Sequence, residues 1–168
     1  RIYRAEQKDI LPWRFDTARN ESLKLVPEDA NILVCVDLDE CFSSGWAAVV
    51  RRQWEEGIHT RGVYRYAWSH NSEGVPLRVF FYDKIHGRGW KWKYPVHETL
   101  VREDGRAGKA VTFEDGVFLH HYQNRETSRS SYLPLLELRV EENPEDYDGI
   151  IYLGYEYQYR RRWEESNR

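Results

Sequence analysis

The sequence lacks methionine altogether and holds only two cysteines, Cys35 and Cys41, in 168 residues. Two cysteines are too few for a disulfide framework, so we expect both to be reduced thiols of a cytoplasmic protein. No apolar run approaches the about 20 residues that a membrane-spanning helix needs, which argues against a transmembrane segment. The chain begins at Arg1 without an initiating methionine, and we expect further residues to precede it.

An excess of charge of either sign is also absent. The 25 basic and 28 acidic residues give a formal net charge of −3. Such a balance provides no long-range attraction to nucleic acid or to anionic membranes, so we expect neither as a partner. Aromatic residues, in contrast, are abundant at 15% of the chain. The length is sufficient for a real hydrophobic core.

One short stretch, from Asn31 to Glu40, combines an apolar run with three carboxylates at its end. The Ile- and Val-rich part predicts a strand over 32–36 that is buried on both faces. Open α/β sheets bind ligands at the carboxyl ends of their strands. Asp37 and Asp39 would place oxygen ligands there, where a hard cation and a phosphate can meet. The alternative interpretation is that both aspartates cap a turn.

Hydrophobic periodicity predicts the elements around this strand. Helices are expected over 17–25 (with Asp16 as N-cap), 46–56, 131–142 and 146–165. Alternation predicts strands over 62–69 and 77–82, a long loop over 83–93, and a hairpin that turns at Asp115-Gly116. The predicted fold class is α/β, a mixed sheet flanked by helices. We assign residues 1–125 to this α/β domain and residues 126–168 to a C-terminal helical hairpin.

Two later pairs add imidazole to the carboxylates: His97-Glu98 and His120-His121. A carboxylate together with an imidazole suits Mn²⁺ better than Ca²⁺, because imidazole is a borderline donor. Glu98 is a candidate general base. Taken singly, a histidine after a strand is usually structural, and a His-Glu pair is common on surfaces.

In their order along the chain, these motifs resemble the family-two-like glycosyltransferases, which have the nucleotide-sugar-binding A fold (GT-A). The matching runs are Phe15-Asp16-Thr17-Ala18-Arg19-Asn20, Val34-Cys35-Val36-Asp37-Leu38-Asp39-Glu40, Val96-His97-Glu98 and Leu119-His120. The C-terminal part is similar to the tetratricopeptide-like helical extension of some members. The resemblance implies a GT-A-like, Rossmann-like sheet whose first strands would precede Arg1.

The resemblance also implies an activity: transfer of a sugar from a nucleotide-diphosphate sugar, with a UDP-sugar as expected donor. The acceptor would be a hydroxyl of a carbohydrate, a lipid-linked molecule or a protein. Mn²⁺ or Mg²⁺ would be bound by Asp39 and His120, and Glu98 would be the base of an inverting reaction. The other residues implied in donor binding are Arg19, Asp37, Trp90, Trp92 and His97. Loop packing is the alternative role for both tryptophans.

Two further function classes remain open at this point. A non-catalytic carbohydrate- or protein-binding module on the same fold predicts binding that persists in EDTA. A metal-dependent nucleotidyl transferase or nuclease fits the acids but predicts a basic groove, which the charge balance does not favour.

Overall fold

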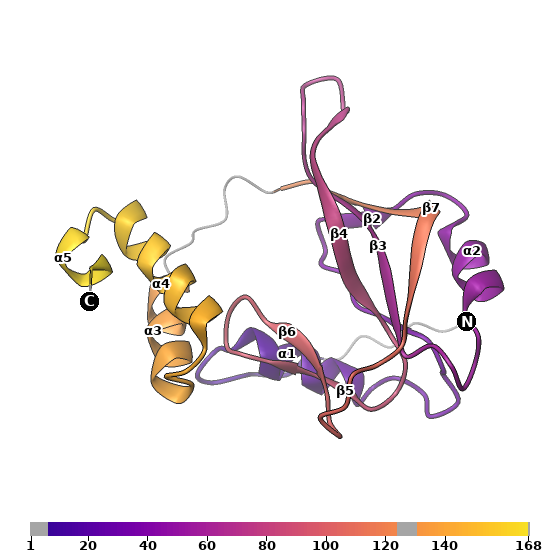
Figure 1. The fold of residues 1–168 in the computed structure, drawn as a ribbon, viewed down its shortest axis with the longest axis horizontal. Coiled ribbons are helices and arrows are strands. Elements are labelled where there is room, and N and C mark those ends of the chain that lie inside the picture. The colour runs from indigo at the N-terminus through magenta and orange to yellow at the C-terminus, as the bar shows by residue number, and fades with distance from the viewer. Residues whose placement is uncertain (1–6, 124–130, 168) are drawn as a thin grey trace. The chain divides into compact units, whose positions relative to one another are not determined.

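The computed structural model describes residues 7–123 and 131–167, and in these residues the chain forms a mixed α/β structure (Figure 1). The described residues divide into two compact units. We call residues 26–91 and 100–123 the sheet unit, and residues 7–25, 92–99 and 131–167 the helical unit. The predicted division near residue 125 falls in the stretch outside the described residues. The contacts instead group the first helix and residues 92–99 with the C-terminal helices.

A five-stranded sheet in the order β1-β4-β3-β7-β2 forms the sheet unit. The strands are β1 (Leu33–Val34), β2 (Glu40–Phe42), β3 (Arg61–His70), β4 (Pro76–His86) and β7 (Ala110–His121). β3 runs parallel to β7, whereas β1–β4, β3–β4 and β2–β7 are antiparallel pairs. The expectation of a mixed sheet is therefore confirmed. The strands curl around a common side, and the β3–β4 hairpin extends beyond the rest of the sheet (Figure 1).

The core of the sheet unit lies between the sheet and helix α2 (Trp46–Gln53), which packs against β7. Its buried members are Val50, Tyr64, Tyr66, Ile85, Phe113, Val117 and Leu119. Trp46 and Trp54 pack against this cluster. The periodicity therefore predicted the start of α2 correctly, although the helix ends at Gln53 rather than at residue 56.

The apolar run before the acids forms a shorter strand than predicted. Only Leu33 and Val34 belong to β1, and Leu33 is buried whereas Val36 is 46% exposed. The main chain stays beside β4 as far as Cys35, whose N–H donates to the carbonyl of Lys84 at 3.0 Å. Beyond that point it leaves the sheet, so the prediction of a strand buried on both faces over 32–36 was wrong.

Two other predictions about loops were also wrong. β4 continues to His86 and β5 (Trp90–Lys93) follows, so most of the predicted loop 83–93 is strand. Residues on both sides of Asp115-Gly116 pair with the same strand, with Tyr64 opposite Phe113 and Arg65 opposite Phe118. Residues 114–117 therefore form a bulge within β7 rather than a hairpin turn. Gly116 has φ +82°, a conformation that glycine adopts at little cost.

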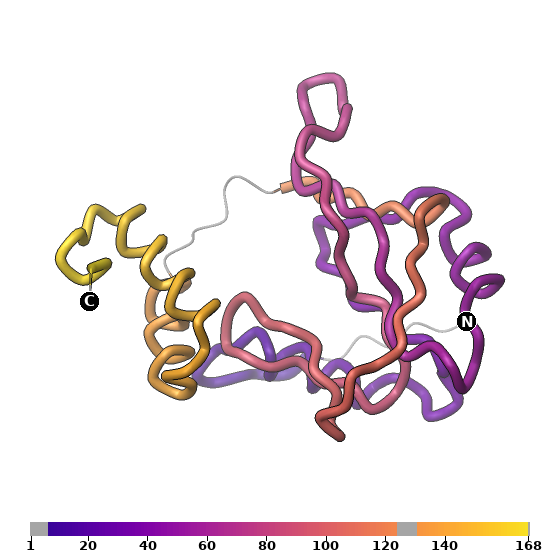
Figure 2. Tube along the Cα trace, viewed as in Figure 1, coloured from indigo at the N-terminus to yellow at the C-terminus, as the bar shows by residue number. Residues whose placement is uncertain are grey.

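In the helical unit, α3 (Tyr132–Glu142) and α4 (Tyr147–Tyr159) form the predicted hairpin, followed by the short helix α5 (Trp163–Ser166) (Figure 2). The break between α3 and α4 lies at Asn143-Pro144, as proline at this position requires. Helix α1 (Phe15–Leu23) contributes Phe15 to a core of Val96, Leu135 and Leu136. β5 and β6 (Thr99–Arg102) form a two-stranded sheet. The boundary between the two units falls inside β5 and again inside β6.

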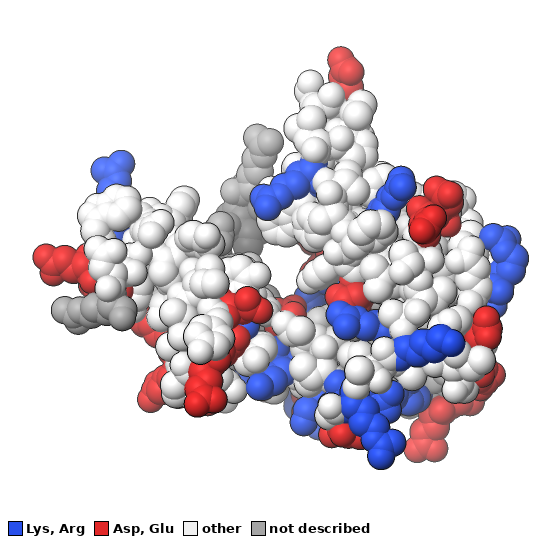
Figure 3. Space-filling view, in the orientation of Figure 1, with Lys and Arg blue, Asp and Glu red and all other residues white. Residues whose placement is uncertain are grey.

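The protruding hairpin has an exposed apolar face. Leu77, Val79 and Phe81 alternate along β4 and are 67%, 44% and 56% exposed. In the space-filling view this hairpin is mostly uncharged, with an acidic side chain near its tip and a basic one lower down (Figure 3). Elsewhere in that view, acidic and basic side chains occur on both units (Figure 3). None of the described helices is both long and apolar enough to cross a membrane.

Candidate active site

The three acids after β1 do not share one environment. Lys84, 3% exposed on β4, donates from Nζ to Asp37 Oδ2 at 2.9 Å and to Glu40 Oε1 at 2.8 Å. Glu40 also accepts the N–H of Asp37 at 2.8 Å, which closes the loop between them. Because both carboxylates are engaged by Lys84, we interpret Asp37 and Glu40 as residues that hold the loop in place.

Asp39 has a different partner. Its Oδ2 lies 3.2 Å from Nε2 of His121, and its carbonyl accepts the N–H of Tyr122 at 2.8 Å. The Asp39 side chain is 36% exposed, whereas that of His121 is 13% exposed. A carboxylate oxygen and an imidazole nitrogen thus meet at the surface of the sheet unit.

The spacing of this pair suits a shared cation. Two ligand atoms at right angles around an octahedral ion, each at about 2.1 Å, are separated by about 3 Å. The observed 3.2 Å is a direct hydrogen-bond contact between the two side chains, and it is also close to that separation. The donor chemistry, carboxylate with imidazole, is suitable for Mn²⁺. Within residues 7–123 and 131–167 no group of three or more His, Cys, Asp or Glu could hold a metal, so other ligands would come from water or substrate.

His120, the predicted ligand, lies on the other face of the strand. The register places Glu40 opposite His121 and Cys41 opposite His120, and adjacent residues of a strand point to opposite faces. His120 Nε2 is 3.2 Å from Ser43 Oγ, and its Nδ1 is 2.9 Å from Nε2 of His70. Burial, with a contribution from His70, lowers the pKa of His120.

Aromatic rings surround His121. The ring of Tyr66 stacks on it at 6.0 Å between centroids, and that of Trp68 lies at 4.9 Å. Tyr66 is 3% exposed; burial, followed by the charge and hydrogen bond of Glu40, raises the pKa of its hydroxyl. These contacts fix the orientation of the imidazole. They also connect it to the acids through Glu40.

Arg19 and Asn20 of α1 contact the chain at Glu98 and at Trp92, on either side of Val96 and His97; we call residues 96–98 the V-H-E segment. The Asn20 side chain bonds to both the N–H and the carbonyl of Trp92, at 2.8 Å each. Arg19 pairs through Nε with Glu98 Oε1, and its guanidinium lies 4.9 Å from the Trp92 ring centroid. Arg19 therefore positions Glu98, a contact that lies within the helical unit.

Both predicted sugar-stacking tryptophans are buried. Trp90 is 8% exposed and Trp92 is 4% exposed. The guanidinium of Arg61 lies 5.6 Å from the Trp90 ring centroid, as that of Arg19 covers Trp92. This burial favours packing as the role of both tryptophans over stacking on a sugar.

Arg139 of α3 also binds the V-H-E segment. It is 1% exposed and donates to Asp146 Oδ2 at 2.7 Å and to the carbonyls of Val96 and His97 at 3.1 and 2.9 Å. Burial is the largest single influence on the Asp146 carboxyl and raises its pKa. The hydrogen bond and charge of Arg139, with smaller contributions from Gly149 and Lys93, together outweigh burial and lower that pKa. Gly149 makes room for the pair, because a Cβ there would lie 2.7 Å from Asp146 Oδ2.

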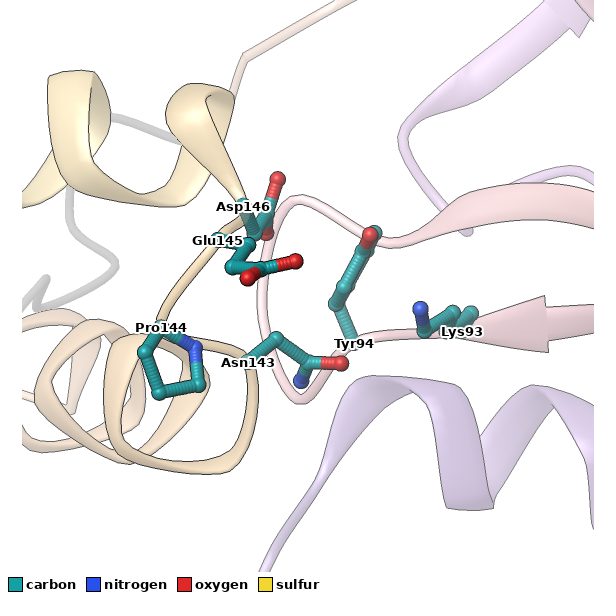
Figure 4. Close-up of a pocket in the computed structure, with 6 residues that line it drawn as sticks. All are labelled: Lys93, Tyr94, Asn143, Pro144, Glu145 and Asp146. Atoms are coloured by element: carbon teal, nitrogen blue, oxygen red, sulfur yellow. The ribbon is translucent and has the colours of Figure 1, made fainter.

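Two residues in or just before the V-H-E segment have a strained backbone. Tyr94 has φ +85° and His97 has φ +50°, values that bulky residues rarely adopt. Such conformations persist only where surrounding contacts enforce them, and they concentrate at functional sites. Beside Tyr94 lies a polar cavity of about 490 Å³ whose other lining residues include Lys93, Glu145 and Asp146 (Figure 4).

Sequence reasoning missed Lys84 and Arg139, because a charged residue inside a strand or helix pattern is usually solvated. Comparison with protein-family models and with curated proteins finds no match for this chain. The case for a function therefore depends on the geometry and on the motif pattern.

Proposed function

We propose that this protein is a metal-dependent glycosyltransferase of the GT-A type. It transfers a sugar from a nucleotide-diphosphate sugar to an acceptor hydroxyl, with inversion at the anomeric carbon. The observation that supports this most strongly is the pair formed by Asp39 Oδ2 and His121 Nε2 at 3.2 Å. The proposal assigns the second ligand position to His121 instead of His120, because Ser43 and His70 engage both nitrogens of His120.

Each residue then has a defined task. A bound divalent cation supplies the positive charge that a departing diphosphate needs. Asp39 and His121 would hold that cation. Lys84 engages Asp37 and Glu40, so the proposal assigns the ligand-facing role to Asp39, the third acid. Glu98 accepts the proton of the acceptor hydroxyl, which is a poor nucleophile until a base removes it. Arg19 and Arg139 position Glu98 and the preceding His97.

The first experiment measures UDP release from UDP-glucose with Mn²⁺ in two matched pairs of variants. Asp39→Asn and His121→Ala should each reduce the rate at least about tenfold, since even residues behind metal ligands have effects of that size. Asp37→Asn and His120→Ala should retain more activity than their neighbours. Electron paramagnetic resonance of Mn²⁺ in the presence of UDP measures metal binding by the same four variants. Equal release from all four variants would refute the proposal.

A second experiment tests the base. Glu98→Gln should lower kcat by about 10²- to 10⁴-fold, the usual contribution of general-base catalysis. Binding of Mn²⁺ and UDP should remain as in the wild type. If the protein is instead a non-catalytic carbohydrate- or protein-binding module, neither the wild type nor any variant shows metal-dependent UDP release. Sugar or protein binding then persists in EDTA.

A further inference from the structure

An open pocket of about 300 Å³ lies in the helical unit. His97, three tyrosines of α4, Glu156 and Leu136 line it, the tyrosines being Tyr152, Tyr155 and Tyr159. Its volume is at the lower end of the range for small-ligand sites, about 300 to 1,000 Å³. We call it the tyrosine pocket.

The tyrosines form a row rather than a cage. Spacings of three and four residues place them on one face of α4, over about 10 Å of helix. Tyr155 is 64% exposed and Tyr159 is 75% exposed. Each ring offers an apolar face and a polar hydroxyl, the combination that suits ligands with one apolar and one hydrated side. A row of this length fits an extended ligand.

Charge in the pocket is compensated. Glu156 is 4% exposed, and its Oε1 accepts a hydrogen bond from Arg160 Nε at 2.9 Å. A quaternary ammonium ligand would require surrounding rings and attraction from an uncompensated charge. An uncharged ligand with hydroxyl groups and C–H faces, such as a sugar chain, suits this lining better.

His97 connects the pocket to the proposed chemistry. Its imidazole stacks on Tyr152, with 4.4 Å between ring centroids and 23° between the planes. Its left-handed backbone is enforced by the Arg139 hydrogen bond to its carbonyl at 2.9 Å. The next residue is Glu98. A ligand in the pocket therefore contacts the same short segment that carries the proposed base.

We propose that the tyrosine pocket binds the acceptor, and that the acceptor is an uncharged carbohydrate chain. This inference rests on the proposed function and narrows its acceptor from three classes to one. The sugar rings lie along the tyrosine row, and their hydroxyls bond to the tyrosine hydroxyls.

The test is an NMR titration of the full chain, in EDTA, with cellobiose, maltose and N,N′-diacetylchitobiose. EDTA excludes any contribution from a cation. At least one disaccharide should shift resonances of Tyr155 and Tyr159. Tyr155→Ala and Tyr159→Ala should each weaken its binding about five- to tenfold, as expected for loss of one important contact. Tyr147→Ala is the matched control, since Tyr147 is on α4, 78% exposed and outside the pocket lining.

Several outcomes would overturn the inference. The first is that none of the three sugars binds, and the second is that Tyr147→Ala weakens binding as much as Tyr155→Ala. The third is a dimer that Tyr155→Ala converts to a monomer, which would mean that a second copy of the chain covers the tyrosine row. Metal-dependent UDP release by the wild type is measured separately. If release occurs but no sugar binds, the inference fails and the proposed function stands. If a sugar binds but UDP is never released, the proposed function fails, and the acceptor role with it.

Discussion

Lys84 in the sheet unit and Arg139 in the helical unit are both buried cations, and they support their motifs differently. Lys84 gathers the carboxylates of Asp37 and Glu40. Arg139 divides its donors between the carboxylate of Asp146 and two main-chain carbonyls. An ammonium is a compact point charge, whereas a guanidinium is a rigid fork of donors. Lys84 therefore sets the charge of its loop, and Arg139 sets the backbone conformation of the V-H-E segment.

The largest effect should follow loss of the buried ammonium. Lys84→Met leaves Glu40, whose side chain is 1% exposed, without compensation. Breaking one partner of a buried pair costs about 3–5 kcal/mol, so urea unfolding at pH 7 should show a loss of that size. The double variant Lys84→Met, Glu40→Gln should recover part of it. A loss below about 1 kcal/mol would mean that water already solvates these acids.

Arg139→Lys should have a smaller effect, about 1–3 kcal/mol in the same urea measurement. Lysine keeps a charge for Asp146 but cannot replace the fork, so at least one buried carbonyl loses its donor. Hydrogen exchange should accelerate at the amides of His97 and Glu98. Asp146→Asn is the control, because it removes the ion pair while the carbonyl contacts remain. If Asp146→Asn accelerates exchange as much, charge rather than geometry fixes the segment.

His86 extends the comparison to a buried base without a carboxylate. It is 1% exposed, its Nδ1 donates to the Gly87 carbonyl at 2.8 Å, and burial lowers its pKa. The unfolded chain therefore binds more protons as pH falls below the ordinary value of about 6.5. Stability should be complete above that pH and fall as pH drops through the lowered pKa, by up to about 1.4 kcal/mol per pH unit. Urea unfolding of His86→Gln between pH 7 and pH 5 should give a flatter profile; an unchanged slope would assign the dependence to other groups.

The smallest effect is expected at an exposed cation. Lys24 pairs with Glu21 at 2.6 Å, but its side chain is 68% exposed. Exposed pairs contribute little, since water screens them. Lys24→Ala should therefore leave the urea midpoint unchanged within error, and a clear shift would show that pairing alone, without burial, stabilises this fold.

Much of the fold was predictable because periodicity reports buried faces. The helices around Val50 and Leu135 and the alternating strand through Tyr64 were all found near their observed bounds. The prediction failed where charged residues are buried in pairs, as at Lys84, and where Asp115-Gly116 forms a bulge instead of a turn. Composition alone cannot distinguish a solvated charge from a compensated one.

The candidate site shows a second limit. The sequence indicated an acid after β1 and a histidine at the end of a later strand. Which of the two adjacent histidines meets Asp39 depends on the face that each presents. That face is set by the register of β7 against β2, which pairs His121 with Glu40. Register arises from tertiary packing, so it could not be read from two consecutive histidines.

The exposed face of β4 has a practical consequence for handling the protein. β1 pairs only with Ile85 and His86, so among the described strands most of β4 has a neighbour along one edge alone. Leu77, Val79 and Phe81 form an exposed apolar face beside that open edge. Long apolar edges template contacts between copies in concentrated solution. Sulfate-rich buffers, which strengthen apolar burial, should therefore precipitate this protein early, whereas low-salt buffers should preserve its colloidal stability.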